Sequence, residues 1–396
     1  MNTKAKQLLT EMIISSNGYS EAEKQQLMKR IDKFELETEP DAETLWKTGI
    51  LIQKIARMNP ETCDVIYRAV RELYEESAKR GNADALRSLG QFYMMGYGVE
   101  KDENKAFEYY NKAAELGNTT AQIDIGVSYY LGTCVEKNRD TALMWFRKAA
   151  ESGDANALWQ MGSFYVSEKR FEEALLWFQR AADAGCDQGF YTLAGMYRDG
   201  YGVEKDAKKG FEYLLKGAQN GEPDSQCCLA IARIEGKFGD YDVEQDAVHS
   251  IDLLRSAVEA DNLQACYCYG KLLVEGEYIE QNIQYGIMHL TFAASNYFYD
   301  AQIYLGSLYY EGDIVEQDPE KCFYWIQEAA ETGKAEALQF LALLYFDGFG
   351  VEENHEKGIE LLKKCIDLGD ETSQQVLDLY YKQLEGEVDS QGDDNL

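Results

Sequence analysis

Four cysteines in the middle of the chain have the spacing that comes closest to a metal site. Cys227 and Cys228 are adjacent, and Cys266 and Cys268 are separated by one residue in what we interpret below as the corresponding helix of the next repeat. Zinc sites usually take ligands from turns of the Cys-x2-4-Cys type, whereas adjacent helical residues point about 100° apart. The sequence therefore predicts buried free cysteines here, with no metal and no cofactor.

Residues that could support catalysis do not converge. His249, His289 and His355 are widely separated, and the chain has no Gly-x-Ser-x-Gly, Ser-x-x-Lys or His-Glu-x-x-His motif. Three Gly-x-Gly turns look like phosphate loops, but they follow predicted helices and recur in register, whereas a dinucleotide fingerprint follows a strand. Because a catalytic site needs convergent ionisable groups, the sequence predicts that the protein is not an enzyme.

The elements that position all these residues follow a repeat of about 36 residues. The segment from Ala83 to Asn118 has characteristic residues, which include Leu89-Gly90, Tyr93 and Ala113-Ala114. Similar residues recur at the equivalent positions of the next 36 residues. Eight whole repeats start at residues 83, 119, 155, 187, 223, 263, 299 and 335. A period of this size is typical of an array of two-helix units, so the sequence predicts an all-α solenoid.

Each repeat has a small residue in the middle of its first helix, at positions 90, 126, 162, 194, 230, 270, 306 and 342. A glycine there costs about 1 kcal/mol of helix propensity, so we expect a neighbouring backbone to approach closely.

Asp or Asn precedes the second helix as an N-cap, which makes this column a cap and not a set of catalytic carboxylates. The second helices end on glycines, as a left-handed residue requires. Asp261 and Tyr297 replace that glycine, and we expect the junctions there to differ.

These residues resemble the Sel1-like repeat family, which is related to the tetratricopeptide repeats. The motif reads Ala-x3-Leu-Gly-x2-Tyr-x2-Gly-x-Gly-Val, then Asp-x3-Ala-x2-Trp-x2-Lys-Ala-Ala-x2-Gly, and the resemblance covers residues 62–384. It implies a right-handed α/α superhelix that binds other proteins along its concave face as a scaffold or adaptor. The penicillin-binding activity ascribed to some relatives makes a β-lactam hydrolase the enzymatic alternative, and the missing Ser-x-x-Lys motif and export signal speak against it.

The ends of the chain differ from the repeats. Residues 1–61 carry no clear repeat and are predicted to form a helical N-terminal cap, with helices over 5–15, 20–34 and 42–58. Residues 62–384 form the solenoid, with flanking half-repeats and a lone last helix over 372–383. The acidic stretch 385–396 is predicted to be a disordered tail.

The composition limits the partners. A formal charge of −31, from 70 acidic and 39 basic residues, argues against nucleic acid as a partner, because phosphate-backbone binders need basic faces. No run approaches the length of a membrane helix. Nine irregularly spaced cysteines and the lack of a signal segment predict a cytoplasmic protein with reduced thiols.

A stripe on the first helices is the first candidate binding surface. It is polar in the N-terminal repeats and becomes apolar in the last two, where it comprises Tyr304, Tyr310, Phe340, Leu343 and Phe346. If it faces the concave side, as the family architecture implies, it would line a groove for an apolar anchor or a helix face. The alternative is ordinary packing between repeats.

A column of glutamates is the second candidate surface. In the early repeats a lysine follows the glutamate, but later Gln or Glu takes its place, so the negative charge is unbalanced at Glu244, Glu280, Glu316 and Glu352. This favours a basic protein or peptide partner, or serves solubility alone. The narrower alternative to a general scaffold is therefore an acidic inhibitor or immunity-type protein that neutralises a basic toxin or nuclease.

Overall fold

The computed structural model describes residues 41–57 and 63–392. The helices predicted over 5–15 and 20–34, and the last four residues of the predicted tail, lie outside these ranges. Over these ranges the chain divides into two compact parts: one runs up to Gly189 and includes Tyr201–Glu204, and the other comprises Phe190–Gly200 and the residues from Lys205 onward. Each part is described by itself.

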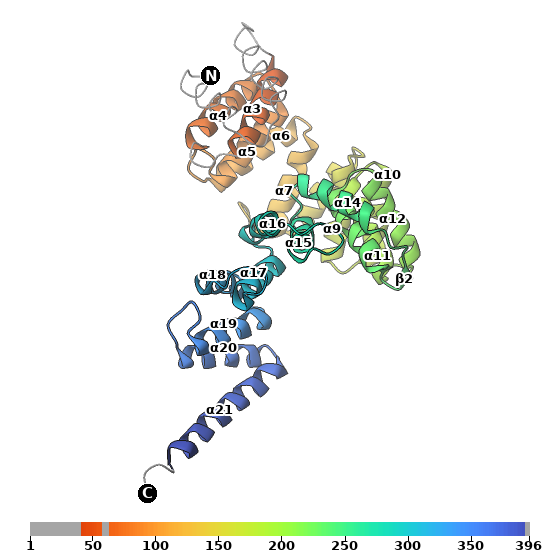
Figure 1. The fold of residues 1–396 in the computed structure, drawn as a ribbon. Coiled ribbons are helices and arrows are strands. Elements are labelled where there is room, and N and C mark those ends of the chain that lie inside the picture. Colours follow the sequence, from red (N-terminus) through yellow and green to blue (C-terminus); the bar gives the residue numbers. More distant parts are fainter. Residues whose placement is uncertain (1–40, 58–62, 393–396) are drawn as a thin grey trace. The chain divides into compact units, whose positions relative to one another are not determined.

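Pairs of helices joined by short loops follow one another along the chain (Figure 1). The first helices of repeats 1 to 8 are α5 Ala83–Met95, α7 Thr119–Leu131, α9 Ala155–Ser167, α11 Asp187–Asp199, α13 Pro223–Glu235, α15 Leu263–Glu275, α17 Tyr299–Glu311 and α19 Ala335–Asp347. The second helices are α6 Glu103–Glu115, α8 Arg139–Ala150, α10 Phe171–Asp183, α12 Ala207–Gln219, α14 Ala247–Glu259, α16 Ile283–Ser295, α18 Pro319–Ala330 and α20 His355–Asp367. All eight predicted starts are confirmed.

One further helix pair precedes the eight repeats. It consists of α3 Ala42–Arg57 and α4 Cys63–Lys79. The Tyr74 ring of α4 lies directly against Gly49 of α3, and its hydroxyl donates a hydrogen bond of 3.0 Å to Gln53 Oε1. The predicted boundary between a cap at 1–61 and a solenoid from 62 therefore falls inside a helix pair, because α3 supplies the first half of the unit whose second half is α4.

The predicted N-caps of the second helices are confirmed. In each case the side-chain oxygen accepts a hydrogen bond from the backbone N–H three residues on, for example 3.0 Å from Lys105 N to Asp102 Oδ1. The same geometry holds at Asn138, Asp206, Asp246, Asn282, Asp318 and Asn354. Each cap satisfies one otherwise unpaired N–H and contributes about 1 kcal/mol over alanine.

The mid-helix glycines make room mainly for a side chain, which corrects the expectation of an approaching backbone. A Cβ on Gly162 would lie 2.5 Å from Cε1 of Phe178, and one on Gly126 would lie 2.6 Å from Cε1 of Phe146. The second helix thus inserts a ring into the notch that the glycine leaves on the first helix. Backbone approach is close at Gly270, where the Gly286 carbonyl would lie 3.0 Å away.

The junctions at Asp261 and Tyr297 keep the regular geometry, so the expectation that they differ is wrong. Both residues have left-handed φ, 59° and 63°, like the glycines they replace. Tyr297 N donates to Ala294 O at 3.0 Å, and the next N–H donates to Ala293 O at 3.1 Å, which is the same pair of bonds that ends α6. The hydrogen bonds of the helix end impose the backbone conformation on whichever residue stands there.

The only strands among the described residues are β1 Lys237–Phe238 and β2 Tyr241–Asp242, an antiparallel hairpin between the two helices of repeat 5. Phe238 is buried and packs with Leu214 and Ala194. The extra residues of this repeat thus extend the local core.

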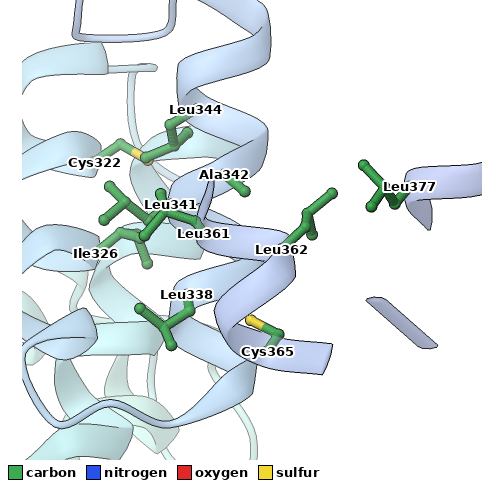
Figure 2. Close-up of a cluster of buried hydrophobic side chains, with 10 residues drawn as sticks. All are labelled: Cys322, Ile326, Leu338, Leu341, Ala342, Leu344, Leu361, Leu362, Cys365 and Leu377. Carbon is green, nitrogen blue, oxygen red and sulfur yellow. The ribbon is translucent and has the colours of Figure 1, made fainter. Parts of the chain in front are cut away.

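The last helix, α21 Glu371–Gly392, covers the end of the array. Its Leu377 reaches a cluster of buried side chains from α18, α19 and α20 that includes Ile326, Leu341 and Leu362 (Figure 2). The helix continues past the predicted end at residue 383 and into the segment 385–396, where the sequence predicts disorder. Gly386 lowers the helix propensity of this segment, but the segment holds no proline, which is the residue that most strongly ends a helix.

Candidate functional site

Three residues of the apolar stripe, Tyr304, Tyr310 and Phe340, pack between neighbouring repeats and are half-buried. The Tyr304 hydroxyl of α17 donates a 2.9 Å hydrogen bond to Glu275 Oε1 of α15, and burial together with this carboxylate raises the pKa of Tyr304. Tyr310 contacts the Phe340 ring edge-on, with centroids 5.5 Å apart. The predicted stripe is therefore partly inter-repeat packing.

The remaining two stripe residues, Phe346 and Leu343, lie on α19 together with Phe340. Phe346 stacks on Tyr380 of α21 at a centroid distance of 4.6 Å, whereas Leu343 is 40% exposed. Leu343 is thus the one member of the stripe that is freely presented to a partner. The structure places all five residues on α17 and α19, as the register predicts, but it does not join them into one hydrophobic pocket.

All four glutamates of the predicted column are exposed. Two of them, Glu316 and Glu352, line the same hollow of about 920 Å³ between the loops of repeats 7 and 8. Glu244 and Glu280 lie in loops of earlier repeats and do not line it. The structure therefore brings two of the four predicted residues together.

The hollow is rich in carboxylates. Asp318 and Glu320 line it together with Glu316 and Glu352, and Lys321 is its only basic residue. Lys321 Nζ lies 2.8 Å from Asp318 Oδ2 and 5.0 Å from the centre of the Tyr309 ring. This hydrogen bond lowers the pKa of Asp318 and raises that of Lys321. One of the four carboxylates is therefore compensated, and three remain available to a cation.

Sequence reasoning missed part of this site, because it assigned Asp318 to a helix cap alone and did not consider Glu320. The signal that could have found them is the spacing Glu316-x-Asp318-x-Glu320, which places three acids at one helix start. Gly350 closes the opposite side, and a Cβ there would lie 2.0 Å from Pro319 O. The two loops that form the hollow thus touch through their backbones.

The charge is concentrated in the C-terminal half of the chain. Residues 205–396 hold 38 acidic and 14 basic residues, a net charge of −24 out of the total of −31. The hollow therefore lies in the more acidic half of the chain.

The four cysteines that suggested a metal site behave as thiols. The Cys227 and Cys268 thiols hydrogen-bond to each other, which lowers the pKa of Cys268 and raises that of Cys227. Cys227, Cys228, Cys266 and Cys268 are free, and Cys227 and Cys266 are buried as predicted, whereas Cys228 and Cys268 are half-buried. Over the described ranges, no group of three or more His, Cys, Asp or Glu side chains has the geometry to hold a metal ion.

Comparison with known proteins identifies the family. The Sel1 repeat profile matches eight segments: 83–118, 119–154, 155–186, 191–222, 225–262, 263–297, 300–334 and 335–370. The chain belongs to the Sel1 repeat family. Sel1 repeats typically mediate protein–protein interactions, and their fold is generally a non-catalytic scaffold. No curated protein matches the sequence of this Sel1 repeat protein.

Solved structures of similar fold are repeat proteins as well. A protective antigen of uropathogenic Escherichia coli with an SLR fold shares 24% identity, with 90% of this chain and 83% of that chain covered and a TM-score of 0.46. A Sel1 repeat protein from Oxalobacter formigenes shares 30% identity over 60% of this chain and 96% of its own, with a TM-score of 0.47. An immunity protein from Pseudomonas aeruginosa shares 20% identity, with 65% and 82% covered and a TM-score of 0.40.

Within residues 41–57 and 63–392, no helix of this Sel1 repeat protein is both long and apolar enough to cross a bilayer.

Proposed function

We propose that this Sel1 repeat protein is a non-enzymatic scaffold that binds a basic partner protein, and that the hollow between repeats 7 and 8 receives a Lys or Arg side chain of that partner. The observation that carries the proposal is the set of four carboxylates around one hollow, of which Lys321 compensates only Asp318. A cation placed there gains attraction from Glu316, Glu320 and Glu352 without first breaking an ion pair that the structure records.

The apolar stripe supports the same proposal, but with one residue in direct contact with the partner instead of five. Leu343 is 40% exposed and is the residue of the stripe that a partner would contact directly. Tyr304, Tyr310, Phe340 and Phe346 fix the spacing of the helices that present it. The charge suggests a narrower class of partner, namely a basic toxin or nuclease. A cytoplasmic location remains a prediction from the cysteine spacing.

The test is a titration of the full chain with a fluorescent, unstructured peptide of Lys, Gly and Ser. The double variant Glu316→Gln with Glu352→Gln should bind it about fivefold more weakly, because each exposed charge contact contributes about 0.5 kcal/mol. The matched control, Glu100→Gln with Glu136→Gln, removes two equivalent glutamates from early repeats in which a lysine follows. Equal loss in both double variants, or binding unchanged at about 1 M salt, would refute the proposed pocket.

A further inference from the structure

The outer face of α16 carries three exposed apolar side chains, which we name the α16 ridge: Tyr285, Met288 and Phe292. Their exposed fractions are 44%, 51% and 40%. They are spaced at i, i+3 and i+7, so they lie on one face of the helix. His289, on the inner side of the ridge, is buried, and burial lowers its pKa, so α16 carries no formal charge near neutral pH.

Each of the other seven second helices in the repeats holds Asp, Glu, Lys or Arg at one or more of these three positions. Counted from the N-cap, the equivalents of Tyr285, Met288 and Phe292 are Lys, Glu and Lys in three of the other repeats: Lys105, Glu108 and Lys112 in α6, Lys209, Glu212 and Lys216 in α12, and Lys357, Glu360 and Lys364 in α20. The middle position is apolar and exposed in three more repeats, at Met144, Leu176 and Tyr324, but only α16 has no charged residue at any of the three positions. In α16 all three charges are replaced by large apolar groups, and these remain exposed.

The ridge lies in a neutral segment with acidic flanks. Residues 281–299 form the longest run of the chain without Asp, Glu, Lys or Arg, whereas residues 239–280 and 300–356 together hold 23 acidic and 4 basic residues. Glu277 and Glu280, in the loop that leads into α16, are exposed, and no ion pair is recorded for either of them among the described residues. Apolar anchors that follow a loop with uncompensated carboxylates complement a partner that is apolar and basic at once.

Tyr297, which follows the end of α16, is a second observation that favours a binding surface in this region. It is 77% exposed and stands with φ 63° where six other repeat junctions have glycine. A left-handed conformation is unfavourable for a non-glycine residue by about 1–2 kcal/mol. The exposed ring recovers little of this by packing within the chain, and strain of this kind concentrates where a ligand is bound.

We propose that the α16 ridge is a docking surface for a cationic amphipathic helix of a partner protein. The apolar side of that helix would pack on Tyr285, Met288 and Phe292, and its Lys and Arg side chains would face carboxylates such as Glu277 and Glu280. Aromatic residues and Met are enriched at protein interfaces, and apolar residues at i, i+3 and i+7 form the face through which one helix packs on another. A second copy of this chain is disfavoured, because its ridge has the same acidic flanks.

This surface does not rest on the proposed function, because it lies on the second helix of repeat 6 and not on the loops of repeats 7 and 8. The two can therefore fail separately. The hollow recognises charge alone, whereas the ridge recognises an apolar face with charge around it.

The experiment measures binding of a fluorescent amphipathic helical peptide of Leu and Lys to the full chain, beside a scrambled peptide of the same composition. The wild type should bind the amphipathic peptide about tenfold more tightly than the scrambled one. The triple variant Tyr285→Lys, Met288→Glu and Phe292→Lys installs the residues of α6, α12 and α20, so the fold should tolerate these substitutions. It should lose this preference while its melting temperature stays unchanged.

Two controls make the result decisive. Met144→Glu changes a 55% exposed methionine at the equivalent position of α8 and should leave the preference intact. Met288→Glu alone, a single change on the surface, should weaken the preference even if the triple variant does not fold. A preference retained in the Met288→Glu protein and in any folded triple variant would overturn the proposal. So would a wild type that is dimeric by sedimentation while the Met288→Glu protein is monomeric, since a second copy would then cover the ridge.

Discussion

The pairing of a mid-helix glycine with a ring from the second helix predicts a coupled pair of substitutions in repeat 3. An alanine at residue 162 would place its Cβ 2.5 Å from Cε1, 2.6 Å from Cδ1 and 2.8 Å from Cζ of Phe178. Phe178 is 1% exposed and its ring also contacts Trp159, with centroids 6.3 Å apart, so it has little room to move. Overpacking of this kind costs about 1–3 kcal/mol.

The net effect of each variant follows from opposing terms. Gly162→Ala gains about 1 kcal/mol of helix propensity, so we expect it to lower the free energy of unfolding by about 1 kcal/mol. Phe178→Leu alone leaves a space beside the glycine and should cost about 1 kcal/mol. The double variant reproduces the Ala194 and Leu214 arrangement of repeat 4, in which both residues are buried in one core. The free energy of unfolding of the double variant should be close to that of the wild type. This corresponds to a coupling energy of about 2 kcal/mol between the two substitutions.

Urea unfolding of the four proteins, followed by tryptophan fluorescence, measures this coupling. The signal reports mainly on the first part of the chain, which contains four of the five tryptophans, Trp46, Trp145, Trp159 and Trp177. Additive effects, with a coupling below about 0.5 kcal/mol, would show that the glycine is not retained for the ring.

Three further predictions concern single residues. Tyr297→Gly should raise the free energy of unfolding by about 1 kcal/mol, because it relieves a left-handed φ of 63° and removes a side chain that is 77% exposed; a drop in urea midpoint would show that the ring packs. Gly350→Ala should lower the free energy of unfolding by about 2 kcal/mol, because φ is 73° and the new Cβ would meet Pro319 O at 2.0 Å. A folded variant with an unchanged urea midpoint would refute this prediction. The pKa of Asp318 lies below its usual value of 3.8, through the Lys321 side chain first and its backbone N–H next. Its contribution to stability is therefore present above that value and is lost as the pH falls through the lower, folded pKa. Asp318→Asn keeps the cap acceptor and should show a weaker loss of stability in acid than the wild type, and an identical acid titration would contradict this reasoning.

The positions of the repeats could be predicted from the sequence because they depend on local rules. The caps from Asp102 to Asn354 and the start of each first helix need only residues within a few positions of one another. Membership of the family could be predicted for the same reason, because the family motif lies within 36 residues.

Contacts between different elements could not be predicted in this way. The role of Gly162 depends on the ring that α10 inserts opposite it, and the place of α3 in the array depends on Tyr74, a residue of the next helix. The sequence treated Tyr297 as a defect, whereas the hydrogen bonds that end α16 give it the same conformation as glycine.

The candidate surfaces show the same division. The sequence by itself determined that Glu316 and Glu352 recur in register and that residues 281–299 are uncharged. Only the tertiary structure decided that the two glutamates line one hollow and that Tyr285, Met288 and Phe292 remain exposed. The physical reason is that exposure and proximity depend on which helix packs on which face, and a periodic sequence gives every repeat the same local pattern.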